Sequence, residues 1–127
     1  MKRLFFLLGI VLGSIVIMSC QDPLPAKPLA KEEFKERIAS LDTLQLIDVR
    51  TPEEFGEGHI NHAQNVDYFK EDAFKTYFEN YDREKPLFLY CRSGNRSQKA
   101  ALILKEMGFE NLFDLEGGYT VWNDKEN

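Results

Sequence analysis

Residues 86–107 read PLFLYCRSGNRSQKAALILKEM, an apolar run that passes through one polar loop into a helical pattern. The apolar residues 86–90 predict a buried strand, and residues 97–107 predict a helix with Gly108 as its C-cap. Cys91 stands where the strand ends and the turn toward the helix begins. Several backbone N–H groups can point at one spot in such a turn, and the helix N-terminus adds positive potential there. The segment therefore predicts an anion-binding turn with a thiol at its entrance.

The loop after Cys91 has the composition of a site for a nucleophilic thiolate. Gly94 allows the tight curve that turns successive N–H groups inward, and Arg92 and Arg96 supply positive charge. Such surroundings favour the thiolate, which is the reactive form of cysteine. Most free cysteines are inert packing residues, but this polar run is a poor choice for a core. We therefore expect Cys91 to be catalytic and the substrate to bind at Arg92, Ser93, Gly94, Asn95, Arg96 and Ser97.

The composition of the chain indicates one globular domain without affinity for nucleic acid. The chain has 127 residues, of which 43% are hydrophobic and 29% are charged, as in a single compact domain. Its formal net charge of −5 is unfavourable for binding nucleic acid. A domain of this size can fold alone, and we expect a monomer.

The N-terminal segment has the pattern of an export signal. Residues 1–3 give a basic start, and residues 4–18 are almost wholly apolar. The apolar run is short for a membrane-spanning helix, which needs about 20 residues. Ser19 and Cys20 end a stretch that resembles the lipobox of bacterial lipoproteins, which implies a signal peptide over residues 1–19 and a lipid on Cys20. The alternative is an uncleaved anchor, and in either case we expect an exported domain, held at a bacterial cell-envelope membrane and facing the periplasm.

The number of cysteines limits the redox chemistry of the chain. The chain has two cysteines, and Cys91 is the one remaining thiol if Cys20 carries lipid. Cys91 can then form no disulfide within the chain, although exported compartments are typically oxidising. The sequence also has no CxxC motif, which excludes a dithiol mechanism of the thioredoxin type within this chain. Any redox cycle at Cys91 therefore needs a second sulfur from a small molecule or a partner protein.

Strand and helix patterns alternate along the rest of the chain. Three prolines mark residues 20–28 as an extended tether, and the domain is expected over residues 29–127. Helices are predicted around residues 34–41, after the N-cap Thr51, over residues 74–81 and over residues 97–107, and strands at residues 44–49, 63–66, 86–90 and 112–115. This alternation predicts an α/β fold with a largely parallel sheet, whose ligands bind beyond the carboxyl ends of the strands.

Three sequence blocks carry the pattern of a known family. The blocks are DVRTPEEF at residues 48–55 with GHINHA at residues 58–63, CRSGNRS at residues 91–97, and EGGY at residues 116–119 with Trp122. Together they resemble the single-domain rhodanese family of sulfurtransferases, in the order and spacing of that family. The resemblance spans residues 29–122. One departure is Asn61, where the family often has glycine, and we expect it to change a local turn without loss of chemistry.

The resemblance implies both a fold and a reaction. The fold is a three-layer rhodanese-like domain, with a central, mostly parallel sheet of about five short strands flanked by helices. The reaction needs no cofactor: the Cys91 thiolate takes a sulfur from an anionic donor such as thiosulfate, releases sulfite and becomes a persulfide. A thiophilic acceptor, cyanide or a thiol, then takes that sulfur. Because an anionic donor must approach an anionic nucleophile, positive charge is needed near both, and Arg92 and Arg96 can supply it.

Other polar and aromatic residues are expected to serve the structure. Asp48 and Arg50 resemble family positions that help hold the architecture, and we interpret Asp48, Arg50 and Glu54 as an ion-pair network. His59 and His62 do not have the spacing of a metal site, and no further ligands cluster nearby, so no metal is expected. The aromatic residues of the helix over 74–81 are expected in the core: Phe74, Tyr77, Phe78 and Tyr81.

Two other functions are alternatives to sulfur transfer with small molecules. Cysteine phosphatases and arsenate reductases separate their Cys and Arg by five residues, whereas four residues separate Cys91 from Arg96. A loop that is one residue shorter suits a phosphoryl group poorly. The second alternative is a membrane-tethered persulfide relay or a binding module for a partner protein. An inactive module usually lacks the cysteine, which this chain keeps.

Overall fold

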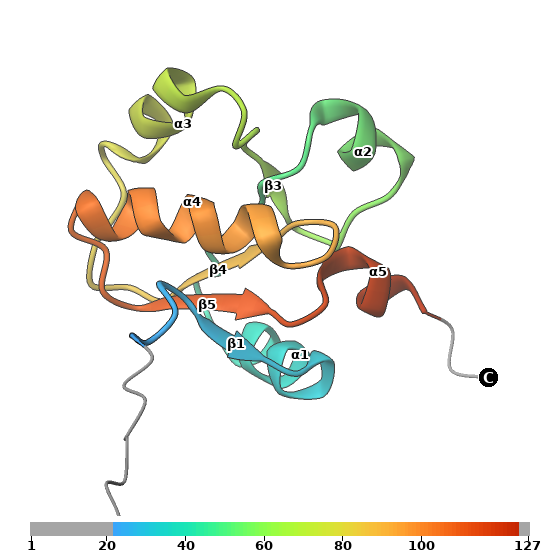
Figure 1. The fold of residues 1–127 in the computed structure, drawn as a ribbon. Helices are drawn as coiled ribbons and strands as arrows, with labels where there is room; N and C mark the ends of the chain where they lie inside the picture. The colour runs from blue at the N-terminus through green and yellow to red at the C-terminus, as the bar shows by residue number, and fades with distance from the viewer. Residues whose placement is uncertain (1–21, 125–127) are drawn as a thin grey trace, which may run out of the picture.

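The computed structural model describes residues 22–124, which form one sheet and five helices (Figure 1). The strands are β1 (Lys27–Leu29), β2 (Leu46–Asp48), β3 (Gln64–Asn65), β4 (Leu87–Tyr90) and β5 (Leu112–Leu115). The helices are α1 (Lys31–Ala39), α2 (Pro52–Glu57), α3 (Glu71–Phe78), α4 (Asn95–Glu106) and α5 (Gly118–Asn123). The predicted signal peptide, residues 1–19, and the predicted lipidation site Cys20 lie outside the described residues. Within residues 22–124, every helix is too short or too polar to cross a membrane.

The strands form one parallel sheet in the order β1-β5-β4-β2-β3. The middle strand is β4, in which Leu87 pairs with Leu112 of β5 and Leu89 pairs with Ile47 of β2. Parallel neighbours need crossover connections, and most of the helices lie within them. The predicted α/β fold with a parallel sheet of five short strands is confirmed. Because Cys91 follows β4, it stands at the carboxyl end of the middle strand.

Alternate residues of the strands pack into two core layers, one on each face of the sheet. Leu87, Leu89 and Cys91 belong to the layer that also holds side chains of α3 and α4. Phe88 and Tyr90 belong to the other layer, with side chains of α1. Figure 1 shows α3 and α4 on one side of the sheet and α1 on the other. Successive side chains of a strand point to opposite faces, so the alternation along β4 directs Cys91 toward α4.

Local sequence accounts for the start of α2 and for the end of α4. The Thr51 side chain accepts a hydrogen bond from the N–H of Glu54, and the Glu54 carboxylate accepts one from the N–H of Thr51, which makes the capping box predicted for α2. At the end of α4, Gly108 follows the C-cap residue Met107 and has a left-handed φ of 97°. The N–H groups of Gly108 and Phe109 donate to carbonyl oxygens of the last turn, and this ends the helix.

The sheet begins before the predicted boundary between tether and domain. The tether was expected over residues 20–28, but β1 begins inside it and pairs with β5 over Lys27–Leu29. Ala26 is fully buried, and the side-chain amide of Gln98 accepts from its N–H over 3.1 Å and donates to its carbonyl oxygen over 2.9 Å. The folded part therefore begins before residue 29, because backbone pairing holds a segment whose prolines suggested an extended linker.

The aromatic stripe expected in the core is only half buried. Phe74 and Phe78 are fully buried, but Tyr77 is 36% exposed and Tyr81 lies beyond the end of α3, at the edge of its layer. The hydroxyl of Tyr81 donates to that of Tyr77 over 3.0 Å, and Tyr77 bonds the side chain of Gln64. The two phenol groups keep hydrogen-bond partners at the rim, which a fully apolar layer does not offer.

Candidate active site

The turn after Cys91 is built on a left-handed glycine. Cys91 is 1% exposed, and Gly94, the N-cap of α4, has a φ of 104°, which glycine adopts readily. The helix begins at Asn95, two residues earlier than the pattern from Ser97 predicts. The loop between β4 and α4 is therefore short, and the first turn of α4 meets the sulfur directly.

Two groups of this turn contact the sulfur. The N–H of Gly94 donates a hydrogen bond to Cys91 Sγ over 3.0 Å. The hydroxyl oxygen of Ser97, a fully buried residue, lies 3.4 Å from the same sulfur. The Ser97 hydroxyl also donates to the carbonyl oxygen of Gly94 over 3.1 Å, which holds the turn closed. An N–H aimed at a sulfur stabilises negative charge on it, so the geometry suits a thiolate or a sulfur anion.

The C-terminal segment braces the backbone of the loop. The Tyr119 N–H donates to the carbonyl oxygen of Cys91 over 2.8 Å, and Thr120 donates to that of Arg92 from its N–H at 3.1 Å and its hydroxyl at 2.9 Å. A Cβ at Gly118 would lie 2.5 Å from the carbonyl oxygen of Cys91, so this close approach requires glycine. The EGGY block therefore supports the loop, a role that sequence reasoning missed although paired glycines before a helical segment were a visible signal.

Arg96 is paired with a carboxylate of another helix. Its Nη1 and Nη2 donate to the two Glu54 carboxylate oxygens over 2.7 Å and 2.8 Å. The Arg96 guanidinium lowers the pKa of Glu54 to about 2. The sequence pattern predicts that Arg96 faces the substrate and that Glu54 shares a network with Asp48 and Arg50. In the structure the side chain of Arg96 joins the start of α4 to α2 instead, so the Glu54 carboxylate already compensates its charge.

Asp48 and Arg50 form a second, separate pair in the interior. Arg50 Nη2 lies 2.6 Å from Asp48 Oδ2, and the two side chains are only 5% and 0% exposed. The same Nη2 donates to the carbonyl oxygen of Gly58 over 2.7 Å. The guanidinium carbon lies 4.3 Å from the ring centroid of Tyr119, a cation–π contact. The Asp48–Arg50 pair thus supports the residue that holds the backbone of Cys91.

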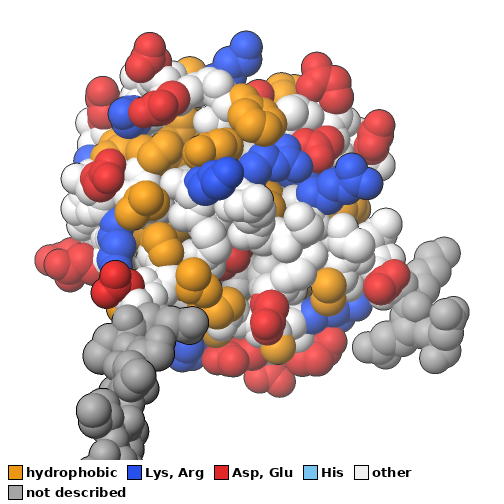
Figure 2. All heavy atoms as spheres, in the orientation of Figure 1, with side chains coloured by type: hydrophobic (Ala, Val, Ile, Leu, Met, Phe, Trp, Pro, Cys, Tyr) orange, Lys and Arg blue, Asp and Glu red, His pale blue; other side chains and the backbone are white. Residues whose placement is uncertain are grey.

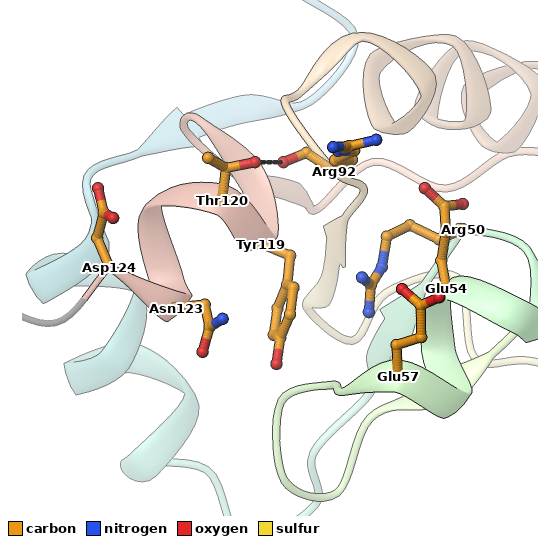
Figure 3. A pocket seen from close by; sticks show the side chains of 8 residues that line it. All are labelled: Arg50, Glu54, Glu57, Arg92, Tyr119, Thr120, Asn123 and Asp124. Carbon is orange, nitrogen blue, oxygen red and sulfur yellow. Dashed lines mark hydrogen bonds between the residues drawn. The ribbon is translucent and has the colours of Figure 1, made fainter.

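A cavity of about 540 Å³ opens beside the loop (Figure 3). The residues that line it are Arg50, Glu54, Glu57, Arg92, Tyr119, Thr120, Asn123 and Asp124. Figure 3 shows Thr120 bonded to the backbone of Arg92 on one side and Tyr119 standing between α5 and the side chains of Arg50 and Glu57. Cys91 is not among the lining residues. The cavity therefore meets the loop at Arg92, and the sulfur lies in the layer on the α4 side.

Asp114 is a buried carboxyl directly behind the turn. It is 2% exposed, its Oδ2 accepts from the side-chain amide of Gln98 over 3.0 Å, and its Oδ1 has no hydrogen-bond partner among residues 22–124. A Cβ at Gly94 would lie 3.9 Å from the same Oδ2. Burial raises the pKa of Asp114 to about 6. Nothing in the sequence marked this residue, because one Asp in a four-residue strand is typical of a solvent-facing position.

The other predicted site residues lie at the surface. Arg92, Ser93 and Asn95 are exposed, and Arg92 has no salt bridge within the described part of the chain. His59 stacks on Phe55 with ring centroids 3.7 Å apart, and its Nδ1 lies 2.9 Å from the Phe55 carbonyl oxygen. Within residues 22–124, no group of three His, Cys, Asp or Glu side chains could hold a metal ion.

Comparisons with known proteins agree with this geometry. The sequence profile of the Rhodanese-like domain matches residues 30–125. The chain is 37% identical over 99 residues to uncharacterized protein YqhL of Bacillus subtilis (strain 168), which covers 78% of this chain and 74% of that protein. It is 32% identical over 78 residues to thiosulfate sulfurtransferase GlpE of Pseudomonas aeruginosa (strain PAO1), which covers 61% of this chain and 68% of that protein.

Two solved structures have the same fold. A rhodanese-like domain protein from Staphylococcus aureus superposes with a TM-score of 0.67 and 26% identity, over 78% of this chain and 93% of that chain. The human single domain sulfurtransferase TSTD1 superposes with a TM-score of 0.66 and 25% identity, over 80% of this chain and 99% of that chain. The similarity therefore extends over most of the described residues.

Proposed function

The chain belongs to the rhodanese-like domain family, and from this we propose that it is a sulfurtransferase that carries a sulfane sulfur on Cys91 as a persulfide. The observation that supports the persulfide most directly is the 3.0 Å hydrogen bond from the Gly94 N–H to Cys91 Sγ. A relative named thiosulfate sulfurtransferase and a structural neighbour named sulfurtransferase support the reaction class.

In the first half-reaction, we propose thiosulfate as the donor. The Cys91 thiolate attacks the outer sulfur, a Cys91 S–S bond forms, and the S–S bond of thiosulfate breaks with its electron pair leaving on sulfite. The outer sulfur keeps its negative charge, so the persulfide is an anion. The Gly94 N–H donates to Cys91 Sγ, and the N-terminus of α4 and the exposed cation of Arg92 stabilise the charge on the outer sulfur.

In the second half-reaction, a thiophilic acceptor removes the outer sulfur. Cyanide or a thiolate attacks the terminal sulfur of the persulfide, the Cys91 S–S bond breaks, and its electron pair returns to Cys91 as thiolate. The products are thiocyanate or a new persulfide on the acceptor. No cofactor is needed, since every electron pair that moves belongs to a sulfur or to the acceptor.

The test is sulfur transfer from thiosulfate to cyanide by the full-length chain in detergent, beside a Cys91→Ser control, with intact-mass spectrometry of both proteins after exposure to thiosulfate. We expect thiocyanate production and one added sulfur atom, both absent in the control. An added sulfur without turnover would identify a relay that awaits a specific acceptor. A folded protein with neither result would overturn the persulfide proposal.

The geometry disfavours a phosphatase reaction. Such a reaction needs the arginine of the loop to hold the phosphoryl oxygens. Arg96 instead gives both of its terminal nitrogens to Glu54. A phosphoryl group would have to displace Glu54 from the pair, whereas the Gly94 N–H already points at Cys91 Sγ without any change in that pair.

We also propose that the domain is exported and tethered to a membrane through a lipid on Cys20. The support is the basic, apolar and small-residue pattern over residues 1–19. Expression in a bacterium with radiolabelled palmitate should label the wild-type chain in the membrane fraction. A Cys20→Ala variant should remain unlabelled, and equal labelling of both chains would contradict the proposal.

A further inference from the structure

The surface beside the Cys91 loop carries a row of cations on a chain that is acidic overall. The net charge of the chain is −5, yet Arg92, Arg96 and Lys99 follow one another from the loop onto α4. Lys99 is three residues from both Arg96 and Leu102, so it neighbours each of them on the surface of the helix. Figure 2 shows a row of Lys and Arg side chains across this region, with hydrophobic side chains directly above it.

Phe69 stands next to this row. It is 63% exposed, which makes it the most exposed large hydrophobic side chain among residues 22–124, and Leu102 on α4 is 50% exposed. The ring centroid of Phe69 lies 5.5 Å from the guanidinium carbon of Arg96. The Phe69 N–H donates to Asp67 Oδ1 over 2.9 Å, and the Lys70 N–H donates to the Asp67 carbonyl oxygen over 3.1 Å. A ring on such a fixed turn loses little entropy when a partner covers it.

This surface extends beyond the reach of a small donor. Lys99 and Leu102 stand about 4.5 Å and 9 Å further along the helix axis than Arg96, at the α-helical rise per residue. A thiosulfate ion at the Cys91 loop would leave both residues uncovered. Exposed apolar side chains favour an apolar partner. Arg92 and Lys99, which form no salt bridge within residues 22–124, favour carboxylates. A protein segment can offer both, together with a thiol, whereas an anionic lipid surface offers no group that accepts the sulfur.

We propose that Phe69, Arg92, Arg96, Lys99 and Leu102 form a docking face for an acidic, partly apolar protein segment that carries the acceptor thiol. The inference rests on the proposed sulfur transfer and adds the chemical class of the acceptor. The negative charge on the rest of the chain repels an acidic partner, so the electrostatic field orients the encounter toward this face.

Transfer at the docking face balances as a thiolate exchange. The thiolate of the bound segment attacks the terminal sulfur of the Cys91 persulfide and forms a new S–S bond. The Cys91 S–S bond breaks, and its electron pair stays on Cys91 Sγ as thiolate. The proton of the acceptor thiol passes to solvent before the attack. No oxidant or reductant is consumed, and the acceptor leaves as a persulfide.

The test uses the full-length chain in detergent and short synthetic peptides with one cysteine. The first peptide contains glutamates and leucines, the second has lysine for each glutamate, and the third has serine for each leucine. A fourth copy of the first peptide has serine for the cysteine and carries a fluorophore, so fluorescence anisotropy measures docking without sulfur chemistry. The charge variant is Lys99→Glu, and its control is Lys105→Glu, an exposed residue of the same helix with the same change in net charge.

We expect the acidic peptide with leucines to take sulfur from the persulfide at least about tenfold faster than the basic peptide, with a preference that weakens as salt is added. Lys99→Glu should lower the affinity for the acidic peptide about tenfold and move the preference toward the basic peptide, while Lys105→Glu should not. Phe69→Ala should weaken binding of the peptide with leucines but not of the peptide with serines, and Leu24→Ala, at an exposed position outside the face, should change neither.

Other outcomes separate the docking face from the sulfur chemistry. If the protein forms no persulfide but binds the fluorescent peptide through Lys99, the proposed function fails and the docking face for an acidic segment stands. If the persulfide forms but the peptides react and bind alike, or if Lys99→Glu and Lys105→Glu behave alike, the docking face is wrong. Vesicles with anionic lipid provide the last arm: binding to them through Lys99 without binding of any peptide would assign the face to a membrane and overturn the proposal.

Discussion

Arg96 and Glu54 are 42 residues apart in sequence and form a bidentate ion pair, with N···O distances of 2.7 Å and 2.8 Å. The pair joins the first turn of α4 to the start of α2, where Glu54 also accepts a hydrogen bond from the N–H of Thr51. One carboxylate thus completes a helix cap and holds the arginine of the Cys91 loop. The electrostatic role that the sequence suggested for Arg96 becomes in part a structural one.

Replacing Glu54 with Gln should lower the free energy of unfolding by about 2 kcal/mol at pH 7, since it removes a charged pair that is mostly shielded from water. The pKa of Glu54 in the fold, about 2, lies below its ordinary value of 4.5. The pair therefore stabilises the fold fully above about pH 4.5 and loses that effect as the pH falls toward 2. Urea unfolding at pH 7 and pH 3 should show a smaller difference between variant and wild type at pH 3. An equal difference at both pH values would contradict the assignment.

Replacing Asp114 with Asn should raise the free energy of unfolding relative to wild type at pH 8 but not at pH 4. Burial raises the pKa of Asp114 from 3.8 to about 6. A raised carboxyl pKa means that the fold favours the protonated form of Asp114. The stability that this form contributes is fully present below pH 3.8 and is lost as the pH rises through about 6. The gain should amount to about 3 kcal/mol across that window. Glu110→Gln, at an exposed position, is the control that should show no such dependence, and a pH-independent effect of Asp114→Asn would refute the assignment.

Replacing Gly118 with Ala should disrupt the Cys91 loop. The added Cβ would lie 2.5 Å from the Cys91 carbonyl oxygen and 2.6 Å from that of Arg92, at a backbone φ of +63°. We expect a loss of at least about 2 kcal/mol in unfolding free energy and a changed rate of Cys91 alkylation by iodoacetamide. Gly56→Ala is the matched control, because nothing lies within 4 Å of its added Cβ and it is inside α2. If Gly118→Ala were as stable as Gly56→Ala, the start of α5 would be able to move away from the Cys91 loop without strain, and the prediction would be wrong.

Replacing Ser97 with Ala should slow persulfide formation from thiosulfate about tenfold, since the variant loses the hydroxyl that lies 3.4 Å from Sγ and closes the turn at Gly94. Single-turnover sulfite release is the measurement. Ser40→Ala, at the exposed end of α1, serves as the control and should react at the wild-type rate. Equal rates for both variants would show that the Gly94 N–H suffices.

The sequence predicted most of what depends on local pattern. The strand before Cys91, the capping box at Thr51 and the helix end near Gly108 each follow from residues close together in the chain, and each is present. What could not be predicted depends on distant partners. β1 is a three-residue edge strand that pairs with β5 through backbone hydrogen bonds, and its side-chain pattern does not predict this pairing.

The site shows the same division between local and distant information. Cys91 and its loop stand where the pattern places them, at the carboxyl end of a strand and before a helix. The sequence does not show that the four charged residues form two separate pairs, Asp48–Arg50 and Glu54–Arg96; only the N···O distances in the structure show this. Burial of Asp114 and exposure of Phe69 also oppose the ordinary preferences of their residue types, so composition alone predicts the reverse.

Because side chains alternate along β4, the number of residues in this strand determines which face of the sheet the sulfur of Cys91 lies on. Leu87, Leu89 and Cys91 face α4, while Phe88 and Tyr90 face α1. Deleting one residue from β4 would exchange odd and even positions and turn the cysteine toward the wrong helix layer, whereas removing two would restore its side of the sheet. A single insertion or deletion in β4 would therefore turn the side chain of Cys91 away from α4, even if every residue of its loop were kept.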